Sequence, residues 1–165
     1  MRTRSIPDKE GLFYELRLLL GAAKLCQLAD EVDLGNTINY FKDSAYVHAR
    51  NLYNFFTKAE PGSDGSITQY AECVISSGLY PNPWKKYLNQ YVMHIRNRSG
   101  SVAVVNGKHI NMMIQDFADD IKNLWQQWVN KTTDPKLKAE LQDLLDKAQR
   151  EVQEDYDNLR GWIKK

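Results

Sequence analysis

The sequence predicts an all-α protein, a single-domain bundle of four to five antiparallel helices that spans residues 1–165. Apolar residues recur every three or four positions in several long segments, which is the spacing of amphipathic helices. Turn-forming residues separate these segments, most clearly in EPGSDGS at 60–66. The 165 residues are 42% hydrophobic and 26% charged, which suits one globular domain with its own core.

The first helix is predicted to follow Asp8 as its N-cap, to carry apolar positions from residue 12 onwards and to end near Asp30. The second is predicted over residues 36–58. In the second helix the apolar stripe advances by three and four residues in turn, so its members share one face. A histidine occupies one position of this stripe and is therefore expected to face a neighbouring helix. The stripe consists of Ile38, Phe41, Ala45, His48, Leu52 and Phe55.

The middle of the chain predicts shorter elements. Residues 67–80 carry a short helical pattern that serines and a glycine interrupt. The third helix is expected to begin after Pro83 and to stop at 99–101. Residues 102–105 favour a strand and precede Asn-Gly, which indicates a loop or a short hairpin arm rather than a sheet. The apolar side of the third helix consists of Trp84, Leu88, Tyr91 and Ile95.

The last two helices have the longest stripes. The fourth is predicted over 109–131, and Thr133-Asp134 is expected to cap a fifth that has Pro135 in its first turn. The inward residues of the fourth helix are Ile110, Met113, Phe117, Ile121, Leu124 and Trp128. Those of the fifth are Leu137, Leu141, Leu144, Ala148, Val152, Leu159 and Ile163.

His48 is the first candidate for a binding site, and the sequence leaves two interpretations open. A buried imidazole needs a partner, so His48 either hydrogen-bonds a neighbouring helix in the core or lines a polar pocket. We expect the second and third helices to run nearly antiparallel, with His48 and His94 facing a common pocket. Arg50 and Asn51 project from other sides of the same helix as further candidates. Arg50 is expected to meet Tyr46, Tyr53 and Asn54.

A second candidate site lies on the third helix, where Tyr87, Tyr91, His94 and Arg98 form a row at helical spacing. The tyrosines are typical of a core, whereas His94 and Arg98 either favour the negative end of the helix dipole or hold an anion. No acidic residue occurs between Glu72 and Asp116, a composition that suits either a surface that faces RNA or an ordinary solvated face. The basic residues of this stretch are Lys85, Lys86, Arg96, Arg98 and Lys108.

Other chemistry is not indicated. The sequence has no glycine-rich phosphate loop, nucleophile elbow or zinc-ligand spacing, so neither a cofactor nor a metal is predicted. Asp119 and Asp120 are expected to be exposed, and Cys26 to serve packing. The charge balance of 22 basic against 21 acidic residues argues against nucleic-acid binding by bulk charge. With no signal peptide or membrane-spanning run, a cytoplasmic protein is expected.

Two phrases of the sequence resemble a known group of proteins. AYVHARNLYNFF at 45–56 and YLNQYVMHIRNRS at 87–99 are similar to recurring phrases of small bacterial helical proteins, and GLYPNPW at 78–84 matches their aromatic-Pro-Trp segment. The resemblance covers about residues 10–130 and implies a relationship to the HEPN helical bundles, some of which are ribonucleases of toxin and phage-defence systems.

The HEPN ribonuclease motif is an arginine and a polar residue followed, a few positions later, by a histidine. Arg50-Asn51 and Arg96-Asn97 each begin it, but Phe55, Phe56 and Thr57, or Ser101, Val102 and Ala103, stand where the histidine belongs. The motif is therefore broken in this chain. The histidine and arginine phrases of the resembled group are matched by His48, Arg50 and His94, and approximately by Arg98.

Three functions follow as hypotheses. The first is a HEPN-like, non-catalytic binding or regulatory module that contacts RNA or a partner protein. The second is a metal-independent ribonuclease with His94 as acid or base and Arg96 or Arg98 on the phosphate. The third is a structural oligomer subunit. The stripe of the fifth helix also widens at Trp162-Ile163, which indicates either a cap on the bundle's own core or a second contact. Because bundles of the resembled kind often pair, the resemblance implies the second contact, and we expect a homodimer.

Overall fold

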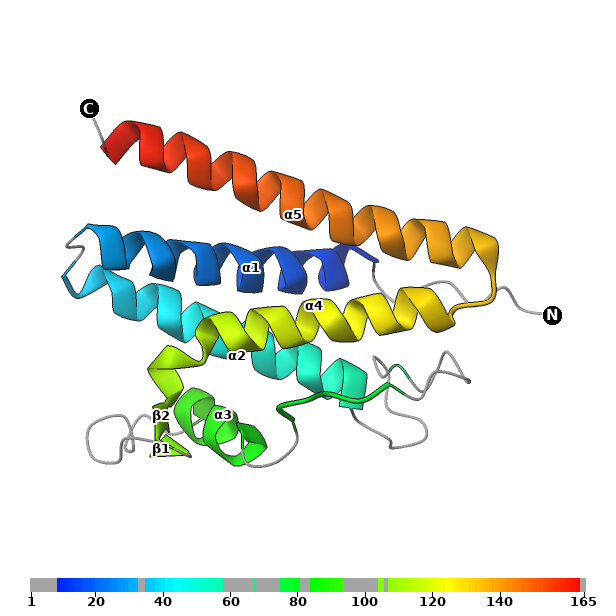
Figure 1. Cartoon of the computed structure of the whole chain (residues 1–165), viewed down its shortest axis with the longest axis horizontal. Coiled ribbons are helices and arrows are strands. Elements are labelled where there is room, and N and C mark those ends of the chain that lie inside the picture. Colours follow the sequence, from blue (N-terminus) through cyan, green and yellow to red (C-terminus); the bar gives the residue numbers. More distant parts are fainter. Residues whose placement is uncertain are drawn as a thin grey trace.

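The computed structural model describes residues 9–32, 35–57, 67, 75–80, 84–93, 104–105 and 107–163. In this part of the chain the structure is an all-helical bundle, as predicted (Figure 1). None of the described helices combines the length and apolar character that crossing a membrane requires. The helices are α1 (Lys9–Glu31), α2 (Thr37–Thr57), α3 (Trp84–Met93), α4 (Ile114–Lys131) and α5 (Pro135–Ile163).

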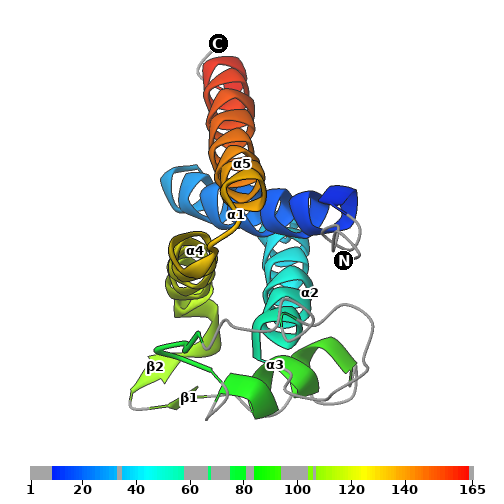
Figure 2. The same cartoon turned by 90° about the vertical axis from the view of Figure 1, so that its right-hand side faces the viewer.

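The bundle is layered, with α1 between the outer helix α5 and the neighbouring pair α2 and α4 (Figure 2). Along their length α1 and α5 run in one direction, and α2 and α4 run in the opposite direction (Figure 1). Helix α3 lies across α2 on the side away from α1 (Figure 2). The expected near-antiparallel packing of the second and third helices is therefore corrected to a crossing.

Helix boundaries follow the local turn chemistry. Gly35, with φ of 54°, lies in the turn between α1 and α2, a backbone conformation that glycine adopts without strain. Before α4, β1 (Val104–Val105) pairs antiparallel with β2 (Lys108–His109), so the hairpin arm is confirmed. Because β2 and the short 3-10 helix η3 (Ile110–Met112) come first, α4 begins five residues later than predicted. The described residues 75–80 are irregular rather than helical.

The centre of the core is aromatic. Trp125 and Trp128 of α4 pack against Phe55 and Phe56 of α2, with ring centroids 5.3–6.1 Å apart. The indole Nε1 of Trp125 donates a hydrogen bond to the backbone oxygen of Leu141, 2.9 Å away, and so ties α4 to α5. The predicted inward stripe of the fourth helix is confirmed, because all of its residues are buried. They are Ile110, Met113, Phe117, Ile121, Leu124 and Trp128.

Helix α5 begins as predicted and ends differently. The side chain of Asp134 accepts a hydrogen bond from the backbone N–H of Lys136 at 2.9 Å, which caps the first turn next to Pro135. The first half of the helix buries Leu141, Leu145 and Ala148. Leu159 and Ile163 were expected inside, but each is 38% exposed because the end of α5 diverges from α1 (Figure 1).

Candidate functional site

The histidine of α2 is held by an acidic residue of α1. The Nδ1 atom of His48 lies 2.8 Å from Oε2 of Glu15, and the side-chain amide of Asn51 donates to both Glu15 oxygens at 3.1 Å. The ring of Tyr14 meets the imidazole edge-on at 5.9 Å, and His48 is only 9% exposed. Two candidate binding residues thus share one carboxylate, in a contact that joins α1 to α2. The predicted pairing with His94 stays a prediction, because His94 lies outside the described residues.

Arg50 joins α2 to α3. Its Nε donates to Oδ1 of Asn89 at 2.8 Å, so its partner is on another helix rather than one of the three expected on its own. Arg50 also acts on Tyr80: burial raises the pKa of the Tyr80 phenol, and the nearby guanidinium partly offsets that rise. The Tyr80 hydroxyl is buried and makes no hydrogen bond within the described part of the chain.

Asp120 anchors the irregular segment before α3. Its carboxylate accepts hydrogen bonds from the hydroxyl of Tyr53 at 2.8 Å, from the hydroxyl of Ser77, and from the backbone N–H of Gly78 at 3.0 Å. Tyr53 in turn stacks flat on Tyr80, with ring centroids 4.4 Å apart. Burial, followed by the charge of Asp120, raises the pKa of the Tyr53 phenol.

The expectation that Asp119 and Asp120 are both exposed is half wrong. Asp119 is exposed and pairs with Lys122 at 2.6 Å, whereas Asp120 is half-buried under its three donors. Among the described residues, no group of acidic, histidine or cysteine side chains is arranged to hold a metal ion.

The proposed basic stretch is only partly described. Lys85 and Lys86 are exposed in the first turn of α3, and Lys108 pairs with Asp116 at 3.3 Å. The predictions for His94, Arg96, Arg98 and the side chain of Tyr91 lie outside the described residues and stay predictions. Cys26 is half-buried against the core, as its expected packing role requires.

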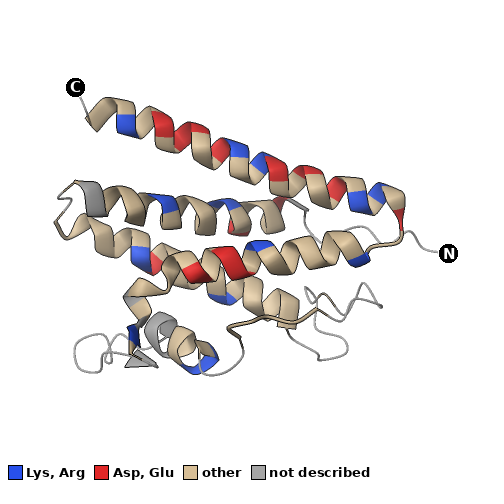
Figure 3. Cartoon of the chain, viewed as in Figure 1, with Lys and Arg blue, Asp and Glu red and all other residues tan. Residues whose placement is uncertain are grey.

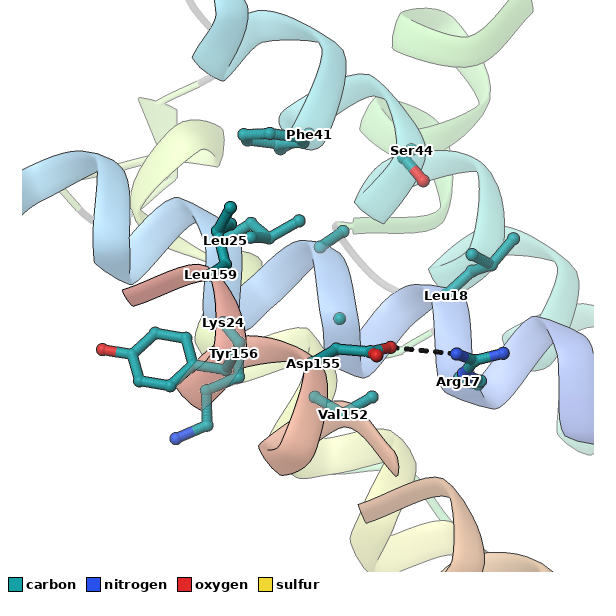
Figure 4. A pocket seen from close by; sticks show the side chains of 12 residues that line it. Arg17, Leu18, Lys24, Leu25, Phe41, Ser44, Val152, Asp155, Tyr156 and Leu159 are labelled. Atoms are coloured by element: carbon teal, nitrogen blue, oxygen red, sulfur yellow. Dashed lines mark hydrogen bonds and ion pairs between the residues drawn. The ribbon is translucent and has the colours of Figure 1, made fainter. Parts of the chain in front are cut away.

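A groove is a further feature of the described surface. This groove of about 550 Å³, partly open to solvent, lies between α1, α2 and the second half of α5, and Figure 4 shows the side chains that line it. Phe41 of α2 stands on one wall, and Leu25 of α1 and Leu159 of α5 stand on the other. The complete lining consists of Arg17, Leu18, Gly21, Ala22, Lys24, Leu25, Phe41, Ser44, Val152, Asp155, Tyr156 and Leu159.

The charges at the groove are already paired within the chain. Arg17 forms ion pairs with Asp155 at 2.9 Å and with Glu151 at 3.1 Å, and these close one end of the groove. At the other end the ammonium of Lys24 lies 5.1 Å from the ring centroid of Tyr156. Between these two ends the lining is predominantly aliphatic and aromatic, so the groove presents a mostly apolar surface.

Exposed apolar side chains extend the groove along each helix. Tyr14 lies on the α1 stripe that continues through Leu18 and Leu25, and it is 58% exposed. Tyr40 and Val47 flank Ser44 at helical spacing on α2. We call this surface the α1–α2–α5 face. It consists of the groove lining together with Tyr14, Tyr40, Val47, Trp162 and Ile163.

Sequence reasoning missed the groove and found one part of the face. The widening of the α5 stripe at Trp162 and Ile163 was its signal, and both residues are exposed. Tyr14 and Tyr40 gave a weaker signal, because an isolated aromatic residue on a helix is equally typical of a core. The groove itself depends on how far α5 separates from α2, which no periodicity encodes.

Comparisons with known proteins leave the function to be argued from this geometry. No family model matches the chain, and no curated protein or solved structure shows significant similarity to it. The relationship to HEPN bundles therefore stays a prediction from the two sequence phrases. The all-helical fold class stands on the structure alone.

Proposed function

We propose that this chain is a non-catalytic helical binding module that takes an apolar segment of a partner protein into its α1–α2–α5 face. The observation that carries the proposal is the open apolar groove, because a large apolar cavity edged by a few polar groups is the usual form of a binding site. Amphipathic helices commonly bind such grooves through residues spaced one helical turn apart. Exposed aromatic residues around the rim extend the same surface.

Charge favours a protein over RNA at this face. The second half of α5, which forms one wall, has four acidic residues and one arginine over 151–163 (Figure 3). Arg17 is engaged by two of these acids, so it is not available to neutralise phosphate. RNA binding instead suits Lys85 and Lys86 on α3, which are exposed and carry no acidic neighbour in their own turn.

The described polar contacts support a non-catalytic role. The Nδ1 atom of His48 is engaged by the carboxylate of Glu15, in a contact that joins α1 to α2. The carboxylate of Asp120 is likewise occupied by three donors that hold a chain segment in place. The ribonuclease hypothesis depends on His94, Arg96 and Arg98 and remains the alternative. A HEPN-like ancestry is compatible with either role.

A library of displayed helical peptides tests the proposal. We expect selected binders to have apolar residues at i, i+3 or i+4, and i+7, because that pattern fits a groove between helices. Ser44→Arg places a charged side chain in the groove without removing core volume, and it should weaken binding by tenfold or more. Asn39→Arg is the matched control, an exposed position of the same helix outside the groove, and it should leave the affinity unchanged.

Two results would contradict the proposal. One is a library that yields no binder, and the other is a set of binders that tolerate Ser44→Arg. Labelled single-stranded RNA is measured in parallel against the wild type and against Lys85→Ala/Lys86→Ala. RNA binding that depends on these lysines and ignores Ser44→Arg would move the function to the RNA alternative.

A further inference from the structure

Resting on the proposed docking role of the α1–α2–α5 face, we infer that its occupant is a second copy of this chain. In the resulting homodimer, Trp162 of each copy seats in the groove of the other, about a two-fold axis. The inference names the partner and the anchor residue, neither of which follows from the groove alone.

The face carries both halves of a self-complementary contact. A two-fold interface uses the same patch on both copies, so that patch must hold a projection as well as a recess. Trp162 is the projection, because it is 80% exposed at the end of α5. It follows Asp155 by seven residues, or two helical turns, and therefore lies on the side of α5 that lines the groove.

Trp162 also has the properties of an interface anchor. Tryptophan is enriched among the few residues that supply most of an interface's binding energy, and such residues fill pockets on the partner. The groove of about 550 Å³ holds a side chain of this size, and it offers Phe41, Leu18 and Leu25 as its walls. Edge-to-face contact between the indole and the Phe41 ring would add to the apolar burial.

The charge of the face permits two identical copies to meet. The groove lining holds Arg17, Lys24 and Asp155, and Arg17 also pairs with the neighbouring Glu151, so the charges of these four residues sum to zero. A face with a surplus of one sign would repel its own copy, since like charges across an interface oppose association. The balance among these four charges therefore presents no such repulsion to a second copy.

The exposed aromatic side chains supply part of the area that a dimer of ordinary size buries. Tyr14, Tyr40 and Trp162 are 58%, 75% and 80% exposed, which leaves roughly 300–500 Å² of aromatic surface on each copy. Two copies together therefore supply about half of the 1,200–2,000 Å² that a standard interface buries. Val47, Ile163 and the groove walls contribute further apolar area.

Sedimentation equilibrium of the full chain tests the inference. The wild type should sediment as a dimer of about 38 kDa, twice the 19.1 kDa of one chain, at tens of micromolar. Trp162→Ser should raise the dimer dissociation constant about thirty-fold or more, and Ser44→Arg should do the same. Met112→Ser is the matched control: it removes an exposed apolar side chain outside the face, and the dissociation constant should not change.

Mixing the two variants separates a reciprocal contact from a general loss of stability. The Trp162→Ser copy keeps its groove, and the Ser44→Arg copy keeps its tryptophan, so an equimolar mixture retains one of the two contacts. The mixture should form a heterodimer at concentrations where each variant alone is monomeric. A general destabilisation predicts no such rescue.

The outcomes distinguish this inference from the proposed function. A wild type that is monomeric at 100 µM, or a dimer that tolerates both substitutions, overturns the self-partner. If helical peptides still bind such a monomer and Ser44→Arg abolishes their binding, the docking role stands and the partner is another protein. If no peptide binds either, both proposals fail.

Discussion

The two halves of α5 have the same apolar periodicity and different surroundings. The first half buries Leu141, Leu145 and Ala148 between α1 and α4. The second half leaves Leu159 and Ile163 38% exposed and Trp162 80% exposed. An apolar stripe therefore fixes which side of a helix is buried, but what covers that side is decided by the neighbouring elements.

The geometry of the bundle explains the difference. Helix α5 is the outermost helix and packs on the bundle from one side only (Figure 2). Helices α1 and α5 are in contact near Gly21, where an added Cβ atom would lie at an ordinary contact distance of 3.9 Å from a methyl group of Val152. Beyond this point α5 diverges (Figure 1), and the space beneath its second half becomes the groove.

Truncation of one leucine in each half should give the largest contrast. Leu141→Ala leaves a cavity at a fully buried site and should lower the free energy of unfolding by about 3 kcal/mol. Leu159→Ala removes a side chain that is already partly hydrated and should cost less than about 1 kcal/mol in the monomer. Urea denaturation at submicromolar concentration measures both. Equal losses would show that the second half is as well covered as the first.

We call the part of the bundle whose apolar side chains are covered within one chain the closed part. Its free energy of unfolding should depend on Asp120 about as strongly as on Leu141. Asp120→Ala leaves the buried Tyr53 hydroxyl without its acceptor and releases Ser77 and Gly78, at a cost of about 2–3 kcal/mol. Asp119→Ala is the matched control on the same helix, and it loses only exposed contacts, the ion pair with Lys122 and a hydrogen bond from Gln115, together worth about 1 kcal/mol or less. Urea denaturation measures both variants. If Asp119→Ala lowered the free energy of unfolding as much as Asp120→Ala, Asp120 would not be the anchor of the segment before α3.

Alkaline pH should act on the closed part through Tyr53. Its pKa is raised in the folded state, so the unfolded chain loses the phenolic proton first, above about pH 10. The contribution of the Tyr53 phenol to the free energy of unfolding is therefore complete below about pH 10, and it declines by about 1.4 kcal/mol per pH unit above that pH. In Tyr53→Phe this share of the decline should disappear. Unfolding free energies measured from pH 8 to pH 11 would contradict the account if the two curves stayed parallel.

Much of the closed part was predictable from the sequence. The α4 stripe from Ile110 to Trp128 was correct at every position, because its residues meet a complete set of neighbours. The orientation of His48 towards another helix was also predictable, since its position in the stripe fixes its face. Glu15 as its partner was not predictable, because that contact depends on how α1 and α2 align.

The candidate site was harder to predict for a physical reason. Arg50 was assigned to neighbours on its own helix, and the crossing of α3 supplied Asn89 instead. Asp120 looked exposed because its donors come from a segment without periodicity. The groove arises from the separation of helices and has no residue pattern of its own in the sequence. Only Trp162 and Ile163, which lie beside it, gave a sequence signal.

Hydrogen exchange along α5, read as a function of protein concentration, tests the central claim most directly. Amides of the first half, 139–148, should be protected equally at 0.5 and 50 µM, because their cover lies within one chain. Amides of the second half, 152–163, should exchange quickly at 0.5 µM and gain about tenfold or more protection at 50 µM, as the second copy covers the face. The account would be contradicted if the protection of the second half were the same at both concentrations. It would also be contradicted if both halves lost protection equally at 0.5 µM.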